Sequence, residues 1–380
     1  MLFPVNYVDT NLNFLNDVLR QFIQKSIVLT NYTKASLFPA AFIPIHDDSG
    51  NDIDIRFKAA FKEIKTLTSA EKKRLLRLYI NHQRIQKLCE EKTLPKLELS
   101  SFPNALQKRL KELGEYLYTS GLKNAAIRKL ANGGADQGVD SLLLHSQRYR
   151  EENGDVCCFC GINDYEEQLA DTVSSKQWRP AYDHYLPKDK YPLAAVNFNN
   201  LFPVCYQCNS KSKGAKDPCY CKLAKQRKLS FYPFNNSVNG GLFFSYSSSE
   251  AAILSNEFWE VELDDDSDEN QLSWDRVFGI TKRVKDRLNR KYKKWLQSVL
   301  AGENSTIDDL KIKLQEASIF NMAEKRNIRD GYHKSLTFGR LATMQDELLE
   351  SIVNALNDEV VPHSRVEALS ALNELGFEFS

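Results

Sequence analysis

The sequence predicts an α+β fold, in which a mainly helical chain surrounds a small central domain that contains β-strands. Apolar residues recur at helical spacing in the first and last thirds of the chain. Two Cys-x-x-Cys pairs, Cys157/Cys160 and Cys205/Cys208, flank a middle part that lacks this spacing. A chain of 380 residues is long enough for two or three domains of roughly 150 residues each. We therefore expect a helical N-terminal region (1–150), a central region (151–235) and a C-terminal region of a β-hairpin followed by helices (236–380).

The N-terminal region is expected to be helical because its apolar residues recur every three or four positions. Thr68 and Glu71 have the spacing of a capping box, and Asn104 can cap a further helix. The glycines in Asn132-Gly133-Gly134 interrupt the pattern and predict a break there. The apolar stripes of the first and last of these helices are Leu15, Val18, Leu19 and Phe22, and Leu106, Leu110, Leu113 and Leu117.

The central region is predicted to form two strands and a short helix. Residues Trp178 to His184 have strand character, and Asn199 to Val204 form the expected partner strand. The polar run after Cys205 can form only a brief helix, because Gly214 suits a helix C-terminus and Pro218 prevents continuation.

The C-terminal region is predicted to begin with a hairpin and to continue as helices. Segments 241–246 and 257–263 have strand character. Three later segments, near 276–300, 307–320 and 339–357, carry helical periodicity.

Composition limits the compartment and the class of protein. The chain has no apolar run of about 18 residues, so no membrane span is expected. The N-terminus lacks a basic segment followed by an apolar one, which argues against secretion and predicts a cytoplasmic location. In that reducing compartment, paired cysteine spacing indicates a metal site before a disulfide.

The two Cys-x-x-Cys pairs together supply four thiolates, the complete ligand set of a tetrahedral structural zinc. The alternative is four buried or free thiols. Cys158 is adjacent to a ligand and is expected to point away, and Cys89 is expected in a helical core. Cys219 and Cys221 are ambiguous: Cys-x-Cys is a less usual metal-binding spacing, so ordinary thiols near the surface are favoured over metal ligands.

Asp183, His184 and Asn209 supply the groups that phosphodiester hydrolysis needs. Histidine titrates near neutral pH, so His184 can take a proton from water. Asp183 offers a carboxylate and Asn209 an amide oxygen, both suited to Mg²⁺ or Mn²⁺. Asn209 directly follows Cys208, so a zinc ion would also fix the start of the helix that carries it. The alternative for His184 is a structural histidine on a strand.

The combined pattern resembles the HNH endonuclease family, which has a ββα-metal, treble-clef-like fold often framed by four-cysteine zinc. The resemblance is carried by Asp183-His184-Tyr185-Leu186-Pro187-Lys188, by the stretch from Asn200 to Asn209 and by Lys213-Gly214. It implies that His184 is the general base and that Asp183 and Asn209 bind the catalytic Mg²⁺ or Mn²⁺. Asn200 corresponds to the family's middle Asn, which holds the loop. Many members have a final His where this chain has Asn209.

A narrower resemblance comes from the form Asp-His-Tyr-Leu-Pro-Lys together with Tyr191-Pro192. It is similar to HNH proteins of prokaryotic anti-phage systems such as the Septu type, which act beside an ATPase subunit. The resemblance implies a defence effector that cuts DNA and has an ATPase or other defence-system subunit as partner.

Charge along the chain is segregated. Nine basic residues face three acidic ones between Asp183 and Lys228, and Asp286 is the sole acid between Arg276 and Lys294. Such basic stretches can bind a phosphate backbone or can be solvated faces. The residues expected to contact nucleic acid are Lys188, Lys211 and Lys213.

Two other functions compete with the endonuclease. One is a non-catalytic, zinc-stabilised module that binds nucleic acid or protein. The other is a scaffold whose helical flanks dock onto a partner while the nuclease stays dormant. A binding module has no need for Asp183, His184 and Asn209 together, which favours the endonuclease.

Overall fold

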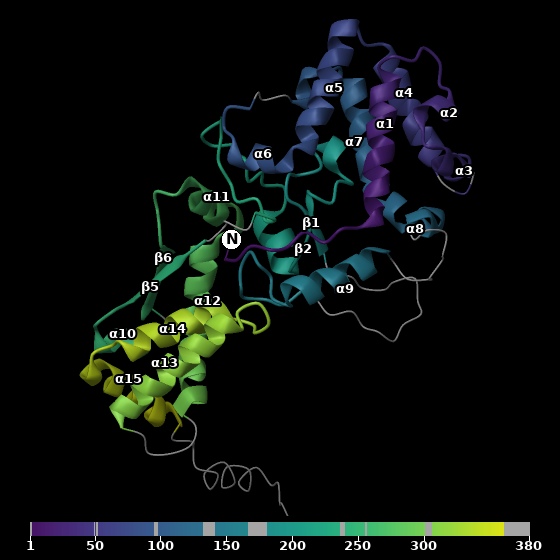
Figure 1. Cartoon of the computed structure of the whole chain (residues 1–380). Helices are drawn as coiled ribbons and strands as arrows, with labels where there is room; N and C mark the ends of the chain where they lie inside the picture. The colour runs from purple at the N-terminus through teal and green to yellow at the C-terminus, as the bar shows by residue number, and fades with distance from the viewer. Residues whose placement is uncertain are drawn as a thin grey trace, which may run out of the picture. The chain divides into compact units, whose positions relative to one another are not determined.

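The computed structural model describes residues 2–48, 50, 52–94, 98–131, 141–165, 181–235, 240–254, 257–300 and 306–360. They form two compact units (Figure 1). Unit 1 comprises Met1–Gly241 and Asp265–Gly279, and unit 2 comprises Leu242–Asp264 and Ile280–Ser380. Ranges 1–150 and 151–235 thus belong to the same unit. Residues 178–180 of the first predicted strand and the predicted break at 132–134 lie outside the described residues.

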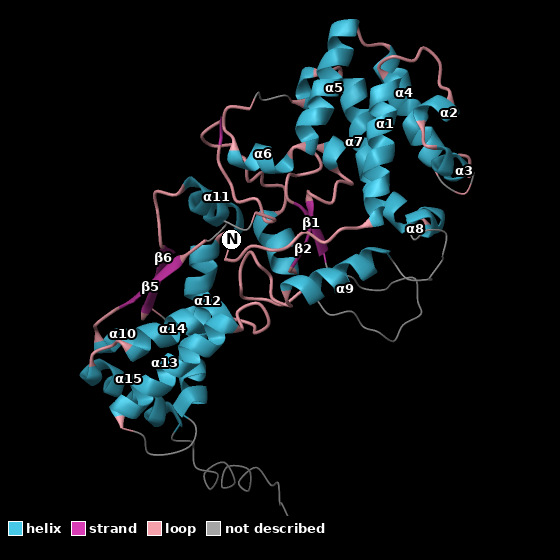
Figure 2. Cartoon of the chain, in the orientation of Figure 1, coloured by secondary structure: helices cyan, strands magenta, loops and turns pink. Residues whose placement is uncertain are grey.

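Helices dominate unit 1, and its strands are few and short (Figure 2). The described residues of unit 1 include five single turns of 3₁₀-helix: η1 (Asn11–Asn13), η2 (Ala40–Phe42), η3 (Leu99–Ser101), η4 (Gly121–Lys123) and η5 (Pro192–Ala194). The α-helices are α1 (Phe14–Ser26), α2 (Lys34–Leu37), α3 (Ile43–His46), α4 (Ile53–Lys65), α5 (Ser69–Gln83), α6 (Ile85–Glu90), α7 (Asn104–Thr119), α8 (Ala125–Ala131), α9 (Ser141–Asn153) and α11 (Glu269–Phe278).

The predicted helix signals have mixed outcomes. The capping box of Thr68 and Glu71 is confirmed at the start of α5, since both of its hydrogen bonds are present. The cap assigned to Asn104 is wrong, because α7 begins at Asn104 itself and Pro103 precedes it at the cap position. Proline fixes φ near −65° and is therefore already suited to this entry. The apolar stripes of α1 and α7 are buried as predicted.

The main core of unit 1 joins the helices to the central strands. Aromatic rings pack at its centre, with Phe22 and Phe57 in T-shaped contact at 4.8 Å between ring centroids. The same core includes Tyr182, Phe198 and Leu201 from the central region. Burying these side chains together stabilises the folded chain by about 25 cal/mol for each Å² of apolar surface that is removed from water. The central strands therefore pack against the helices through this shared core.

The central region forms the predicted order of strand, loop, strand and short helix. β1 (Ala181–His184) pairs antiparallel with β2 (Leu201–Val204), with Asp183 opposite Phe202 and His184 opposite Leu201. A short π-helix, η6 (Gln207–Lys213), follows at once. Gly214 ends it with φ of +51°, a conformation that favours glycine.

A second, two-residue ladder and one late helix complete unit 1. β3 (Tyr220–Cys221) pairs antiparallel with β4 (Gln226–Arg227). Helix α11 packs on η6, and the indole Nε1 of Trp274 donates to the carbonyl oxygen of Phe159 at 2.9 Å. A segment of the predicted C-terminal region therefore supports the central one.

Unit 2 contains the predicted hairpin and the last helices. β5 (Leu242–Tyr246) pairs antiparallel with β6 (Trp259–Leu263), as expected. The helices are α10 (Glu250–Leu254), α12 (Ile280–Leu300), α13 (Ile307–Ala323), α14 (Gly331–Ala342) and α15 (Asp346–Val360).

Two of the predicted C-terminal helices are each divided. The segment 276–300 is interrupted by Gly279, whose left-handed φ of +61° ends α11 before α12 begins. The segment 339–357 is interrupted after Ala342, where the Thr343 hydroxyl bonds back to the carbonyl oxygens of the last turn of α14. Asp346 and Glu347 then favour a new helix start. None of the described helices combines the length and apolar character needed to cross a bilayer.

Candidate functional site

Four buried cysteine side chains converge beside the β1–β2 hairpin. The sulfurs of Cys157, Cys160, Cys205 and Cys208 all lie within 4.8 Å of one another. The Cys160 and Cys205 sulfurs are 3.8 Å apart. A tetrahedral zinc with Zn–S bonds near 2.3 Å needs sulfurs about 3.8 Å apart. The four cysteines can therefore hold a structural zinc ion.

Local backbone geometry presents each pair of sulfurs. The amides of Cys160 and Gly161 both donate to the Cys157 carbonyl oxygen, and Gly161 has φ of +62°. This tight turn places the first two sulfurs on the same side. Cys205 directly follows β2 and Cys208 lies in η6, so the second pair is set by the strand-to-helix transition. The thiol frame and the hairpin are thus parts of one structure.

Donors also surround the sulfurs. The Ile162 amide donates to the Cys160 sulfur at 3.5 Å, and the Asn163 side-chain amide donates to the Cys205 sulfur at 3.7 Å. Burial, and then the neighbouring thiols, raise the pKa of Cys157 well above its ordinary value. A cluster of thiolates here therefore requires a compensating cation, which is what a bound zinc supplies.

The remaining cysteines differ from one another. Cys158 and Cys89 are both fully buried, and the prediction of a core position for Cys89 is confirmed. The prediction of a near-surface Cys219 is wrong, because it is 1% exposed and its thiol contacts the Cys89 sulfur at 3.7 Å and the Ser230 hydroxyl at 3.2 Å. The Asp217 carboxylate turns this segment inward by accepting from the Cys219 amide. Cys221 is half-buried.

Asp183 is buried on β1 in an ion pair with Lys213. The Lys213 ammonium donates to Asp183 Oδ1 at 2.9 Å and to the His184 carbonyl oxygen at 2.7 Å. Both side chains are almost fully buried, at 1% and 4% exposed. The second oxygen of Asp183, Oδ2, is buried without a hydrogen-bond partner. Burial raises the pKa of Asp183, and the Lys213 charge opposes that rise.

His184 lies at the end of β1 with a defined tautomer. Its Nε2 is 2.9 Å from the Ala195 carbonyl oxygen. A carbonyl can only accept, so Nε2 carries the proton and Nδ1 keeps a lone pair. The Tyr118 ring of α7 packs edge-on against the imidazole at 4.3 Å between centroids. Burial lowers the pKa of His184 to about 3, with Lys188 and Lys213 adding to the effect, so the ring is neutral.

The side chain of Asn200 holds the loop between β1 and β2 in one conformation through hydrogen bonds to the loop backbone. Its side-chain oxygen accepts from the Leu186 amide at 2.8 Å. Its side-chain nitrogen donates to the carbonyl oxygens of Leu186 at 3.0 Å and Ala194 at 3.4 Å. All these groups are buried, so Asn200 acts on the conformation of the loop that carries Ala195, the acceptor for His184.

Asn209 is half-buried in η6, the helix that also supplies Lys213. The backbone N–H of Asn209 donates to the Cys205 carbonyl oxygen at 3.0 Å, which connects Asn209 to the thiol frame. In the described part of the chain, no hydrogen bond joins the side chains of Asp183, His184 and Asn209 to one another. The geometry brings Asp183 and η6 together through Lys213, and it places His184 against Tyr118.

The three lysines expected to contact nucleic acid occupy different environments. Lys211 is exposed in η6, above the Tyr206 ring at 5.9 Å. Lys188 is half-buried, pairs with Glu115 and lies over the Tyr118 ring at 5.7 Å. The prediction that Lys213 contacts nucleic acid is corrected, because its side chain is buried and its ammonium is paired with the Asp183 carboxylate. The fold turns the Lys213 side chain inward, and the polar residues around it in the sequence do not predict this burial.

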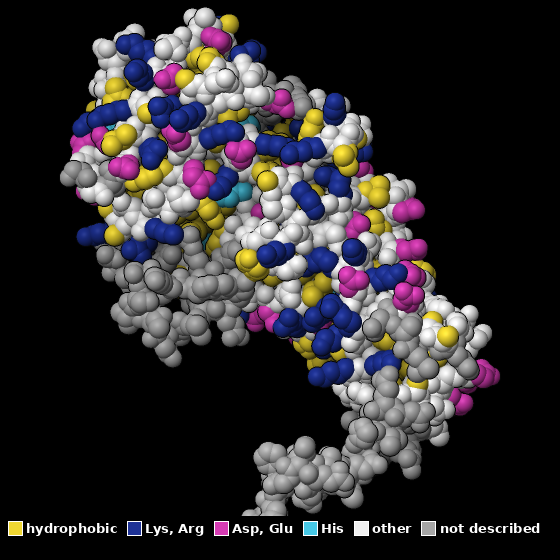
Figure 3. Space-filling model, turned by 180° about the vertical axis from the view of Figure 1, so that it is seen from behind, with side chains coloured by type: hydrophobic (Ala, Val, Ile, Leu, Met, Phe, Trp, Pro, Cys, Tyr) yellow, Lys and Arg dark blue, Asp and Glu magenta, His cyan; other side chains and the backbone are white. Residues whose placement is uncertain are grey.

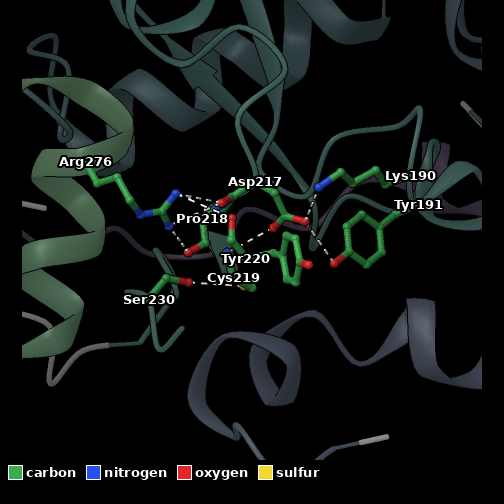
Figure 4. Close-up of polar contacts among 8 residues, drawn as sticks. All are labelled: Lys190, Tyr191, Asp217, Pro218, Cys219, Tyr220, Ser230 and Arg276. Carbon is green, nitrogen blue, oxygen red and sulfur yellow. Dashed lines mark hydrogen bonds and ion pairs between the residues drawn. The ribbon is translucent and has the colours of Figure 1, made fainter. Parts of the chain in front are cut away.

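A second buried carboxylate lies near the same loops (Figure 4). Asp217 Oδ2 accepts from Lys190 Nζ and from the Tyr191 hydroxyl, each at 3.2 Å. The guanidinium of Arg276, on α11, donates to the carbonyl oxygens of Asp217 at 3.3 Å and Pro218 at 2.7 Å. A cavity of about 310 Å³ is lined by several of these residues, including Asp217 and Tyr191.

Three participants were not found from the sequence: Tyr118, the buried role of Lys213, and Asp217. Tyr118 lies in α7, 66 positions before His184 in the chain, and only the fold brings the two rings together. Asp217 stands in a basic segment and carries no local motif. A pairing signal from related sequences could have found these contacts, whereas residue spacing could not.

One short similarity to a known protein accompanies this geometry. A stretch of 35 residues is 54% identical to the Septu protein PtuB of Bacillus thuringiensis. It covers 9% of this chain and 13% of that protein, so most of both chains lies outside the likeness. No family model matches the chain, and no solved structure matches it. The four-cysteine cluster and this likeness both fit a Septu-like defence protein.

Proposed function

We propose that the protein is a metal-dependent endonuclease of the HNH type that hydrolyses phosphodiester bonds in DNA. One observation carries the proposal: the four-cysteine cluster, the strand with Asp183 and His184 and the short helix with Asn209 form one continuous structure. The order of strand, strand and helix is the one that the HNH resemblance implies. The similarity to a Septu protein supports a role in anti-phage defence.

His184 is the proposed general base. Its Nε2–H is held by the Ala195 carbonyl oxygen, which leaves Nδ1 free to accept a proton from the attacking water. A pKa of about 3 makes the free imidazole a weak base. The negative charge of a bound phosphodiester raises the pKa of a nearby histidine, because opposite charges favour the protonated form. The ring therefore becomes a stronger base when substrate is present.

Asp183 and Asn209 are the proposed ligands of the catalytic Mg²⁺ or Mn²⁺. The buried, unpartnered Oδ2 of Asp183 fits this role, and carboxylate and amide oxygens are the hard donors that these ions prefer. When bound, the ion supplies charge stabilisation to the phosphate. Lys213 keeps Asp183 ionised and in place, while Lys188 and Lys211 are the proposed phosphate contacts.

The experiment is a cleavage assay with the purified full-length chain. Plasmid DNA and an RNA of matched length are incubated with Mg²⁺, with Mn²⁺ and without a divalent ion. We expect nicking or cutting of DNA only with the divalent ion, giving 5′-phosphate and 3′-hydroxyl ends. Because the proposal includes an ATPase or other defence-system subunit as partner, the assay is repeated in lysate of the native host. Absence of cleavage under both conditions would contradict the proposal.

A non-catalytic, zinc-stabilised binding module is the second candidate. The observations that favour it are the burial of His184 at 8% exposed and the Asp183 charge already paired with Lys213. This candidate predicts one zinc per chain and binding of nucleic acid or protein, with no divalent-dependent cleavage under any condition. The same assay, combined with metal analysis, separates the two.

A further inference from the structure

Helix α12 of unit 2 carries a concentrated positive charge. Its 21 residues include eight Lys or Arg and a single acid, Asp286. The opposite side of the helix is apolar and buried in unit 2, through residues that include Val284, Leu288 and Tyr292. With 3.6 residues per turn, most of the basic residues lie away from this buried side, whereas Lys285 and Lys291, each seven residues from Tyr292 and Val284 respectively, lie beside it. Figure 3 shows Lys and Arg side chains spread over the face of the molecule that it draws, interspersed with Asp and Glu side chains.

Lys285 and Arg287 of α12 form ion pairs within unit 2. Lys285 pairs with Glu260 of β6 at 2.5 Å. Arg287 makes a bidentate pair with Asp330, at 2.6 and 2.5 Å, and Asp330 is 4% exposed. These pairs attach α12 to the hairpin and to the turn before α14. Their charges are compensated and are not available to a ligand.

Four other cations remain exposed, and we call them the α12 basic face: Lys282, Arg290, Lys291 and Lys294. None of the four forms an ion pair with a carboxylate of the described residues. At 1.5 Å per residue they extend over about 18 Å. Phosphates follow one another at about 3.4 Å along one DNA strand, so this length matches about five phosphates.

The turn attached to α12 adds to the same charge. The Arg287–Asp330 pair holds the segment 324–330 beside the helix, and this segment carries Lys325, Arg326 and Arg329 together with the acid Glu324. Asp330 adopts a left-handed φ of +60°, and a side chain at Gly331 would meet the Lys325 backbone at 3.1 Å. The turn is therefore tightly specified. Burial and the Arg326 charge lower the pKa of Lys325.

We propose that the α12 basic face is a binding surface for the phosphate backbone of nucleic acid. An acidic membrane is disfavoured, because the apolar side of α12 is buried in the protein and cannot enter lipid. A protein partner is disfavoured, because this face has no exposed large apolar residue to form an interface core. The inference deepens the proposed nuclease function by giving unit 2 the task of holding substrate.

The test replaces the four residues together by glutamine: Lys282→Gln, Arg290→Gln, Lys291→Gln and Lys294→Gln. Glutamine keeps helix propensity and removes charge. The matched control removes four exposed charges from α4 and α5: Lys62→Gln, Lys65→Gln, Lys73→Gln and Arg77→Gln. A charge-retaining swap of the α12 basic face (Lys to Arg and Arg to Lys) shows whether the helix tolerates substitution.

Binding is measured by fluorescence anisotropy on a labelled DNA duplex, in a His184→Ala background so that nothing is cut. Salt is varied between about 50 and 200 mM. The slope of log K against log salt is negative. Each lost phosphate contact reduces its magnitude by about 0.9, so four lost contacts reduce it by about 3.6. We expect the glutamine variant to bind at least about tenfold more weakly at low salt, whereas the control and the swap bind like the parent.

Several outcomes would overturn the inference: unchanged binding by the glutamine variant, equal loss in the control, no duplex binding by the parent, or equally tight binding of polyglutamate, which would indicate an acidic protein partner. Cleavage with His184 intact separates the two proposals. If the protein cuts DNA and the glutamine variant binds and cuts normally, the nuclease proposal stands and this inference falls. If binding depends on the α12 basic face but nothing is cut, the nuclease proposal falls alone.

Discussion

Replacing Lys213 by methionine removes the ammonium from a buried pair while keeping a side chain of similar length. The change leaves the Asp183 carboxylate with both oxygens unpartnered, since Oδ2 already lacks a hydrogen bond and Oδ1 loses its donor. It also removes the donor to the His184 carbonyl oxygen. Breaking a buried pair in this way costs about 3–5 kcal/mol of the free energy of unfolding.

The assay is urea unfolding at pH 7, with Lys211→Met as the matched control. Lys211 lies two residues away in the same short helix but is exposed, so its replacement should change stability by less than about 0.5 kcal/mol. Adding Asp183→Asn to Lys213→Met removes the stranded charge, so the double variant should lose about 2–3 kcal/mol less than the two single losses added together. A Lys213→Met protein within about 1 kcal/mol of wild type would refute this account of the pair.

Three further predictions concern the cysteine cluster, the buried His82 of α5 and the end of η6. Cys205→Ser should abolish binding of one zinc per chain, measured by plasma emission, and lower the melting temperature, whereas Cys221→Ser, at a half-buried cysteine, should change neither. Burial lowers the pKa of His82 to about 3, while an unfolded histidine titrates near 6.5, so the unfolded chain binds more protons between these values. The free energy of unfolding should therefore fall as pH drops below about 6.5, by up to about 1.4 kcal/mol per pH unit. In urea titrations, His82→Phe should make this pH dependence less steep. An unchanged slope in the variant would contradict the role given to His82. Gly214→Ala, at φ of +51° with open space around the added carbon, should cost about 1–3 kcal/mol from backbone strain alone, and thermal melting would show it.

The parts of the structure that depend on local spacing were predictable. Two cysteines separated by two residues form a tight turn in most contexts, and Gly214 ends a helix because of its own backbone freedom. The strand character of the segment from Trp178 to His184 predicted that Asp183 lies on a strand, as it does in β1. These features need only a few neighbouring residues to be correct.

The parts that depend on contacts between distant segments were not predictable. The Tyr118 ring meets His184 only because α7 and the hairpin share one core. The burial of Lys213 follows from its reach to Asp183, 30 positions earlier, and its own neighbours in η6 are polar. The placement of α11 depends on contacts with distant segments, among them the hydrogen bond from Trp274 to Phe159 and those from Arg276 to Asp217 and Pro218. No periodicity or spacing in one sequence contains this information.

The most direct measurement of the central claim is the single-turnover rate of DNA cleavage by His184→Ala, compared with wild type at equal zinc content and equal melting temperature. Removing a general base lowers the rate by about 10²–10⁴-fold, and we expect a loss in this range with Mg²⁺ present. A His184→Ala protein that keeps its zinc and cuts DNA within about twofold of the wild-type rate would contradict the claim that this imidazole takes the proton from water.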